Sequence, residues 1–279
     1  MERRADPRPI AVFDSGVGGL TVLSEIRRRL PAESTVYLGD NARTPYGPRP
    51  AEEVRSFTLE CVGWLLDQDV KLLVLACNTA TARALEPVRE SSDVPVVGVV
   101  RPGAVAAAAA SRTRHVGVMA TAGTVQSGAY PAAIVEADPR VRVAQQACPE
   151  LVPLVESGAL DGPRVEATVD GYLAPLFASD PAIDTLLLGC THYPLLRPVI
   201  ERYAGDPVTV VDSAFTTALA VEDLLDALGT RTGPTADAGP PAHRVVTTGD
   251  VASFSAVARR VFGAELPAVE PASVSSVLP

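Results

Sequence analysis

Short runs of apolar, often β-branched residues recur along the chain and alternate with segments whose apolar residues return every three or four positions. Most of the runs are apolar throughout, which is typical of strands covered on both faces in a parallel sheet. We expect strands at residues 10–14, 35–39, 72–76, 94–99, 115–120, 142–147, 185–189, 208–211 and 244–247. We expect helices at residues 20–30, 51–67, 80–90, 124–137, 164–177, 214–228 and 253–262. This alternation predicts βαβ units and an α/β fold.

Polar and reactive residues collect directly after several of the predicted strands. In α/β folds, ligands bind beyond the carboxyl ends of the strands. That edge carries Asp14-Ser15, Asp40-Asn41, Cys77-Asn78-Thr79, Thr121, Cys190-Thr191-His192 and Asp212-Ser213. Ser, Thr, Asp and Asn are also common helix N-caps at such places, but cysteine is not. The two cysteines therefore indicate a functional site.

Two segments of the chain share one pattern. In LLVLACNTATA (72–82) an apolar strand runs into Cys77 and two polar residues, and TLLLGCTHYP (185–194) does the same at Cys190. The pattern predicts two diverged α/β halves whose strand ends face one cleft. A thiol at a helix start meets unpaired N–H groups and the positive end of the helix dipole, so we expect a lowered pKa for both thiols. Thr79 is expected to cap the helix after Cys77.

Two matched thiols suit a particular chemistry. Placed on opposite sides of a substrate, one can remove a proton from a carbon while the other returns a proton to the opposite face. One must be thiolate when the other is thiol, so the pair titrates as a unit. His192 is a candidate to tune Cys190, and Asp14 to tune Cys77. A disulfide or redox pair is the alternative, although no CxxC occurs; Cys61 and Cys148 are expected to be inert buried residues.

The stretch FDSGVGGL places Gly16, Gly18 and Gly19 between a strand and a helix. It lacks the last glycine of a dinucleotide fingerprint and the lysine of a P-loop. If the stretch binds a ligand, we therefore expect a small anion, such as a carboxylate, at the start of the helix; a simple glycine-rich turn is the alternative. The proline-rich segment RTPYGPRP follows the second strand. It fits either a surface loop or a loop whose Tyr46 and Gly47 close over a ligand.

Composition narrows the class of protein. The 279 residues are enough for two domains, and the net charge of −9 argues against a general nucleic-acid binder. The sequence shows no apolar run long enough for a membrane span and no signal-peptide pattern, so we expect a cytoplasmic protein with reduced thiols. Four cysteines without CxxC and three histidines predict no metal site. Lys71, the only lysine, precedes a buried strand and gives no pyridoxal-phosphate signature, so no cofactor is expected.

The segments DSGVGGLTVL, GDNARTPYG, ACNTATA, ATAGTVQSGAY and GCTHYPLL, in this order, resemble those of glutamate racemases. These are cofactor-independent amino-acid racemases that supply D-glutamate for bacterial peptidoglycan. The resemblance spans residues 10 to about 218. It implies two pseudo-symmetric α/β lobes, each with a mostly parallel sheet flanked by helices, and an active site in the cleft between them. The first lobe is expected at 1–98 and 208–279, and the second at 99–207.

The resemblance also implies roles for individual residues. Cys77 is expected to act on D-glutamate and Cys190 on L-glutamate, assisted by Asp14 and His192. The expected substrate-binding residues are Asp14, Ser15, Tyr46, Gly47, Asn78, Thr79, Thr191 and His192. The chain departs from the family pattern at Arg101, where many relatives have an acidic residue, and at Asn41 and Pro50; none of these is a catalytic position.

The resemblance implies a homodimer, with no membrane and no direct nucleic-acid contact. Some members bind and inhibit DNA gyrase, so a gyrase interaction is expected on resemblance alone. Three alternatives stay open from the sequence. They are a two-cysteine racemase acting on aspartate or a related acid, a thiol redox protein, and a non-catalytic binding module.

Overall fold

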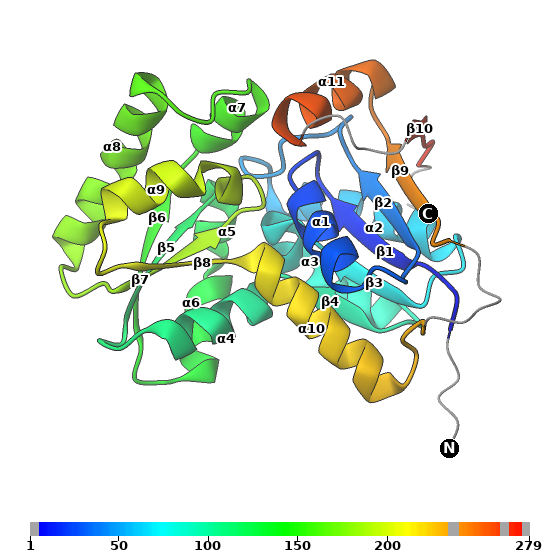
Figure 1. Ribbon diagram of the computed structural model, residues 1–279, viewed down its shortest axis with the longest axis horizontal. Coiled ribbons are helices and arrows are strands. Elements are labelled where there is room, and N and C mark those ends of the chain that lie inside the picture. The colour runs from blue at the N-terminus through cyan, green and yellow to red at the C-terminus, as the bar shows by residue number, and fades with distance from the viewer. Residues whose placement is uncertain (1–5, 234–239, 263–267, 275–279) are drawn as a thin grey trace.

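Two parallel β-sheets, one in each of two lobes, form the centre of the molecule (Figure 1). The structure is a computed structural model that describes residues 6–233, 240–262 and 268–274. The strands are β1 (Ile10–Asp14), β2 (Thr35–Gly39), β3 (Leu72–Leu75), β4 (Val96–Gly98), β5 (His115–Ala120), β6 (Arg142–Ala147), β7 (Thr185–Gly189), β8 (Thr209–Asp212), β9 (His243–Thr247) and β10 (Val269–Pro271). The helices are α1 (Leu20–Arg29), α2 (Ala51–Leu66), α3 (Asn78–Ser91), α4 (Val100–Ala110), α5 (Ala122–Ser127), α6 (Ala129–Ala137), α7 (Leu151–Glu156), α8 (Pro163–Ser179), α9 (Arg197–Ala204), α10 (Ser213–Leu228) and α11 (Val251–Phe262), with a 3₁₀ turn η1 (Tyr193–Leu196).

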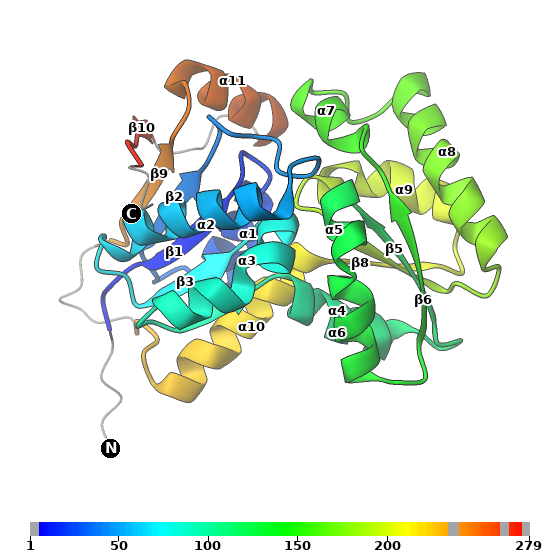
Figure 2. The same cartoon turned by 180° about the vertical axis from the view of Figure 1, so that it is seen from behind.

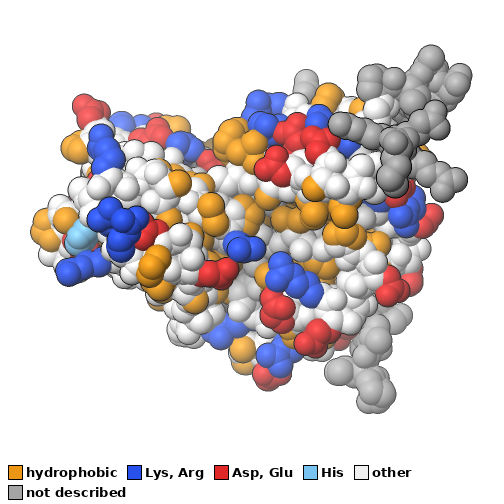
Figure 3. Space-filling view, turned by 90° about the horizontal axis from the view of Figure 1, so that it is seen from below, with side chains coloured by type: hydrophobic (Ala, Val, Ile, Leu, Met, Phe, Trp, Pro, Cys, Tyr) orange, Lys and Arg blue, Asp and Glu red, His pale blue; other side chains and the backbone are white. Residues whose placement is uncertain are grey.

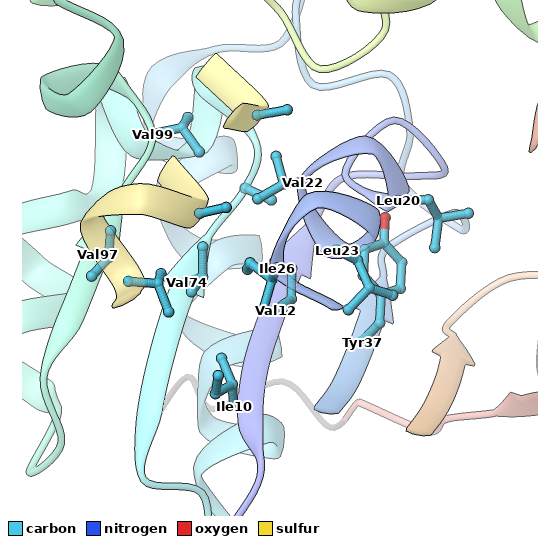
Figure 4. Close-up of a cluster of buried hydrophobic side chains, with 14 of the residues drawn as sticks. Ile10, Val12, Leu20, Val22, Leu23, Ile26, Tyr37, Val74, Val97 and Val99 are labelled. Carbon is cyan, nitrogen blue, oxygen red and sulfur yellow. The ribbon is translucent and has the colours of Figure 1, made fainter. Parts of the chain in front are cut away.

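The first lobe contains a sheet in the order β10-β9-β2-β1-β3-β4, and all its pairs are parallel. Alternate side chains of β1 point to opposite faces. Ile10 and Val12 pack with α1, α10 and α11, as Figure 4 shows in part, whereas Ala11 and Phe13 pack with α2 and α3 on the face seen in Figure 2. Both faces are therefore covered, which explains why the strand is apolar from Ile10 to Phe13.

The second lobe contains a sheet in the order β6-β5-β7-β8, again parallel throughout. Leu186 and Leu188 of β7 pack with α7, α8 and α9, whereas Leu187 packs with α4 and α6 on the other face. The expected α/β fold with two parallel, helix-flanked sheets is confirmed. Because the strands of each sheet run in one direction, their carboxyl ends form one edge per lobe, and reactive residues follow β3 and β7 there.

The chain crosses between the lobes at two places that lie close together. It leaves the first sheet after β4 and enters α4 in the second lobe, and it returns from β8 into α10, which packs on both α1 and α4. We expected the return at residue 208, and this boundary is wrong by one strand. Strand β8 pairs with β7, and Val210 is buried in the core of the second lobe. Parts of the range 208–279 lie outside the described residues.

Several elements differ from the sequence-based expectation. Helix α4 was missed because Pro102 and Gly103 suggest a break, yet Pro102 lies in the first helical turn, where proline is tolerated. The helix expected at 124–137 is divided into α5 and α6 by Gly128, whose φ of 68° lies in the left-handed region. Helix α7 and strand β10 were also missed.

A buried ion pair connects separate segments of the first lobe. Lys71 Nζ lies 2.6 Å from Glu33 Oε2, and each side chain is 1% exposed. Lys71 also donates to the carbonyl oxygens of Asp6 and Thr230, at 2.7 and 2.9 Å, and Glu33 accepts from the backbone N–H of Thr232 at 2.8 Å. A single lysine therefore joins the start of the chain, the turn before β2 and the segment after α10.

Apolar and charged side chains are interspersed on the face shown in Figure 3. Among the described residues, the large exposed hydrophobic side chains include Val105 of α4 and Phe215 and Leu228 of α10. Within the described ranges, no helix is long and apolar enough to cross a bilayer.

Candidate active site

A cavity of about 270 Å³ lies between the lobes at the carboxyl edges of the two sheets. Residues from both lobes line it. They are Ser15, Thr44, Pro45, Tyr46, Gly47, Pro48, Cys77, Asn78 and Thr79 from the first lobe, and Thr121, Ala122, Cys148, Pro149, Val152, Pro153, Cys190, Thr191 and His192 from the second. The two cysteines singled out from the sequence therefore face the same cavity.

Cys77 is the N-cap of α3, so its sulfur lies at the start of the helix. Its Sγ accepts from the backbone N–H of Ala80 at 3.4 Å and lies 3.4 Å from Ser15 Oγ. The expected lowering of its pKa is wrong. Burial, together with the nearby charge of Asp14, raises the pKa of Cys77 to about 12, against the smaller effects of the Ser15 and Ala80 hydrogen bonds. Cys77 is therefore a thiol at neutral pH.

Cys190 has a basic neighbour instead. His192 Nδ1 lies 3.9 Å from Cys190 Sγ, and His192 Nε2 lies 3.0 Å from Glu156 Oε1 of α7. Burial lowers the pKa of His192, but the hydrogen bonds with Cys190 and Glu156 outweigh it and raise the pKa to about 10. The ring is therefore a buried imidazolium beside one sulfur at neutral pH. The two cysteines lie in different electrostatic environments although their local sequences match.

Asp14 lies behind the cavity rather than in its lining. Its carboxylate is fully buried, accepts from the backbone N–H of Gly16 at 3.0 Å, and lies 3.4 Å from Thr191 Oγ1. Burial raises the pKa of Asp14, against the opposing charge of His192. Asp14 therefore sits between the strand end of the first lobe and the Thr191-His192 segment of the second.

The glycine stretch does not line the cavity, contrary to the expected anion site. A Cβ placed at Gly18 would overlap Thr191 Oγ1 and the His192 ring, and one at Gly19 would lie 2.5 Å from Asp14 Cβ. The space that the glycines provide is occupied by side chains of the second lobe and by Asp14. The glycines thus allow the lobes to approach each other, and Ser15 is the member of this segment that reaches the cavity.

Tyr46 and Gly47 lie on the loop after β2, at the cavity wall. The Tyr46 hydroxyl donates to Asp40 Oδ2 at 2.5 Å, and the same oxygen accepts from Arg43 Nε at 2.7 Å. Burial raises the pKa of Tyr46, so the phenol stays protonated. The Gly47 carbonyl accepts from the backbone N–H of Gly123 in the second lobe at 2.9 Å. The loop is therefore anchored in its own lobe and also touches the other.

Asn78 and Thr79 begin α3 and reach across to the second lobe. The Asn78 Oδ1 accepts from the Tyr130 hydroxyl at 2.5 Å. Thr79 does not cap its helix as expected, because Cys77 occupies that position. The Thr79 Oγ1 instead lies 2.9 Å from Thr121 Oγ1 and 3.2 Å from Thr124 Oγ1. Thr191 is held by its backbone, whose carbonyl accepts from Thr21 Oγ1 at 3.1 Å.

Sequence reasoning missed part of this site. Cys148, expected to be inert, lines the cavity, although burial raises its pKa and keeps it a thiol. Glu156 was missed because it lies on α7, a helix of six residues that was not predicted. Arg101, the main departure from the family pattern, is exposed and pairs with Glu136 at 3.1 Å. The described residues contain no group of three or more His, Cys, Asp or Glu side chains arranged for a metal ion.

Comparisons with known proteins agree with this geometry. The family model of the Asp/Glu/hydantoin racemases matches residues 11–221. A glutamate racemase of Shouchella clausii is 52% identical over 251 residues, which cover 90% of this chain and 89% of the relative. The crystal structure of glutamate racemase isoform RacE1 from Bacillus anthracis has a TM-score of 0.88 at 44% identity, covering 96% of this chain and 97% of that chain. Glutamate racemase from Francisella tularensis, crystallised with D-glutamate, has a TM-score of 0.88 at 32% identity, covering 97% of this chain and 99% of that chain.

The chain therefore belongs to the Asp/Glu/hydantoin racemase family and is an amino-acid racemase. The resemblance to glutamate racemases in particular, expected from the sequence motifs, is confirmed by the relatives named above.

Proposed function

We propose that this racemase interconverts L-glutamate and D-glutamate by direct proton transfer at the α-carbon, with Cys77 and Cys190 as the two acid/base groups and no cofactor. The observation that carries the proposal is that the two thiols, one from each lobe, line the same cavity. The relatives at 52% and 44% identity are named glutamate racemases, and the Francisella tularensis relative was crystallised with D-glutamate. These names support glutamate as the substrate.

In the direction from L- to D-glutamate, the Cys190 thiolate takes the α-proton. The Cys77 thiol gives its proton to the opposite face of the same carbon, so the enzyme ends with Cys190 as thiol and Cys77 as thiolate. The surroundings of the two sulfurs support this starting state. The imidazolium of His192 stabilises negative charge near Cys190, and the raised pKa of Cys77 keeps that residue protonated. In the reverse direction the roles exchange.

Removing the α-proton of an amino acid is difficult, so the site must stabilise the carbanion-like transition state. Enzymes typically supply about 8–23 kcal/mol in such cases. The lining residues include no Lys or Arg. The two carboxylates of the substrate would therefore be held mainly by neutral groups, for which Ser15, Asn78, Thr79 and Thr191 are our candidates, together with Tyr46 and Gly47. The His192 imidazolium would be the one cationic donor among our candidates. Asp14, behind the cavity, acts through its neighbours Cys77 and Thr191. Hydrogen bonds in a cavity that excludes water are stronger than in solution.

The proposal is tested by incubating the protein with L-glutamate in deuterated water without added cofactor. Circular dichroism follows the loss of optical activity, and mass spectrometry follows deuterium at the α-carbon. We expect both signals for the unsubstituted chain and neither racemisation signal for Cys77→Ala or Cys190→Ala. Single Cys→Ser variants are expected to keep one half-reaction, such as α-proton exchange from one enantiomer. Full activity of either Ala variant in both directions would falsify the two-thiol mechanism.

Cys61 offers a matched control. It is buried like the other cysteines but does not line the cavity, so Cys61→Ala should keep racemase activity. Turnover of the aspartate enantiomers, measured in parallel, decides between the two acidic substrates. Mild oxidation followed by mass spectrometry tests the redox alternative, which requires a Cys77–Cys190 disulfide.

The wider biological role rests on the resemblance. We propose that the enzyme supplies D-glutamate for peptidoglycan synthesis in the cytoplasm, as a homodimer. Rescue of a D-glutamate auxotroph and sedimentation velocity test these two points. A DNA gyrase supercoiling assay with the Cys77→Ala, Cys190→Ala double variant tests whether gyrase is a partner independently of catalysis.

A further inference from the structure

Tyr130 connects the second lobe to a polar group of the cavity that belongs to the first lobe. It lies on α6, which follows α5, and α5 contacts α3 (Figure 2). Its ring is fully buried, and its hydroxyl donates to Asn78 Oδ1 at 2.5 Å. This contact joins residues 52 positions apart in the sequence.

The other end of the Asn78 amide has no partner. Asn78 Nδ2 is buried and forms no hydrogen bond among the described residues, although Asn78 lines the cavity. A buried amide N–H without a partner is costly unless a ligand completes it. An asparagine amide can be rotated by 180° at little cost, which would exchange its donor and acceptor ends. A neighbouring group must therefore fix which end of the Asn78 amide faces the cavity.

The Tyr130 hydroxyl is such a group, because it donates to the oxygen end of the amide, Asn78 Oδ1. Burial raises the pKa of Tyr130, so the phenol keeps its proton. Ser213 is a second polar neighbour, and because its hydroxyl lowers the pKa of Tyr130, it acts on the phenol as a donor. If the amide were reversed, the phenol would face the Asn78 N–H donor in place of the Oδ1 acceptor, and an amide oxygen would replace the N–H donor at the cavity. A carboxylate substrate would then meet an acceptor in place of a donor.

We propose that Tyr130 is a positioning residue that fixes the direction of the Asn78 amide, so that Nδ2 is presented to a carboxylate group of the substrate. The inference rests on the proposed function for the identity of that substrate. Because Tyr130 comes from the second lobe, the donor is set in its working direction only when the two lobes are together. The carboxylate carries its charge in both the ground state and the transition state, so Tyr130 contributes mainly to binding.

The test is a double-mutant cycle of Tyr130→Phe and Asn78→Ala, with kcat and KM measured for both enantiomers. Tyr130→Phe is expected to lower kcat/KM about tenfold to a hundredfold, mainly by raising KM, because a hydrogen bond to a charged group is lost. If Tyr130 acts through Asn78, the double variant is no worse than Asn78→Ala alone. A KM for Tyr130→Phe within about twofold of the unsubstituted value, or multiplicative effects in the cycle, overturns the proposal.

Two further variants complete the design. Asn78→Asp keeps an acceptor for Tyr130 but has no N–H donor, so it should bind substrate more weakly than Asn78→Ala; binding equal to that of the unsubstituted chain overturns the proposal. Tyr172 lies on α8, and Tyr172→Phe removes a hydroxyl that lies 3.2 Å from Glu150 Oε1; this variant should leave KM unchanged.

The kinetics use whichever of glutamate and aspartate the unsubstituted chain racemises. If the chain racemises aspartate but not glutamate, the proposal of glutamate as the substrate is wrong. The kinetics with aspartate would still test the role of Tyr130, because both amino acids carry an α-carboxylate. Turnover of neither would defeat both proposals.

Discussion

Gly18 of the first lobe lies directly against the imidazole of His192 in the second. A Cβ on Gly18 would overlap His192 Nδ1 and Cε1 as well as Thr191 Oγ1. The same His192 ring is held on its other side by Glu156. The ring therefore cannot move aside without losing its carboxylate partner, and the absence of a side chain at position 18 is a condition for the closed arrangement of the site.

Gly18→Ala should accordingly lower both activity and stability. The added methyl group displaces His192 or separates the lobes, and overpacking of this kind costs about 1–3 kcal/mol. We expect a fall in kcat/KM of about tenfold or more, measured with either enantiomer, and a lower melting temperature. Gly63→Ala is the control: no atom lies within 4 Å of its added Cβ, and it should be neutral or stabilising by up to about 1 kcal/mol. Unchanged activity of Gly18→Ala would show that the contact is unimportant.

The pH dependence of stability should report on His192. The pKa of His192 is about 10 in the folded chain and about 6.5 in the unfolded chain. Its stabilising contribution to the free energy of unfolding is therefore fully present below pH 6.5 and is lost as the pH rises toward 10. We expect the free energy of unfolding, measured by urea denaturation, to fall between pH 6.5 and 9. The slope should be smaller in His192→Asn and in Glu156→Gln. An unchanged slope in both variants would assign the pH dependence to other groups.

Cys77 should react slowly with alkylating reagents at neutral pH. Only the thiolate reacts, and a pKa of about 12 leaves very little thiolate at pH 8. In the Cys190→Ala variant, carbamidomethylation of Cys77 by iodoacetamide, followed by mass spectrometry, should accelerate about tenfold per pH unit up to pH 10. Asp14→Asn should speed the reaction at pH 8, because the charge of Asp14 contributes to the raised pKa. A rate that levels off below pH 9 would contradict this assignment.

Breaking the buried pair of Lys71 and Glu33 should destabilise the first lobe without a direct effect on the cavity. Lys71→Met leaves the Glu33 carboxylate buried and unpaired, which costs about 3–5 kcal/mol. The double variant Lys71→Met, Glu33→Gln should recover part of that loss, as measured by urea denaturation. The exposed pair of Arg55 and Glu52 is the control, and Arg55→Ala should change stability by less than about 1 kcal/mol. A loss that small for Lys71→Met would show that the pair contributes little.

The strands were the most predictable part of this protein. Strands β1 and β7 contain unbroken apolar runs, residues 10–13 and 186–188, because both faces of their sheets are covered, and this pattern is visible in the sequence. Helix α4 was not predictable in the same way, since its proline and glycine suggest a break and only its packing on α6 and α10 shows the contrary. Strand β8 was predicted, but the sheet to which it belongs is set by its pairing with β7, and the local sequence pattern does not indicate that pairing.

The same distinction applies to the site. Cys77 and Cys190 could be found because cysteine after a buried strand is unusual and occurs twice. The raised pKa of Cys77 and the imidazolium beside Cys190 could not be found, since burial outweighs the helix start at Cys77 and a distant residue, Glu156, holds the His192 ring. The role of Gly18 was misjudged for a related reason. Its neighbours, Thr191 and His192, are far away in the sequence.

Both connections between the lobes, from β4 into α4 and from β8 into α10, run along one margin of the molecule. That margin is therefore the position where a hinge between the two lobes would lie. A rotation of the lobes about α4 and α10 would widen the cavity and would move the opposite margin furthest. There α7 contacts α11, and Val261 of α11 is buried in the core of the second lobe. Such a separation of the lobes would require the contact between α7 and α11 to break. Because α7 also carries Glu156, the Glu156 carboxylate would then move away from the first lobe together with the His192 ring that it holds.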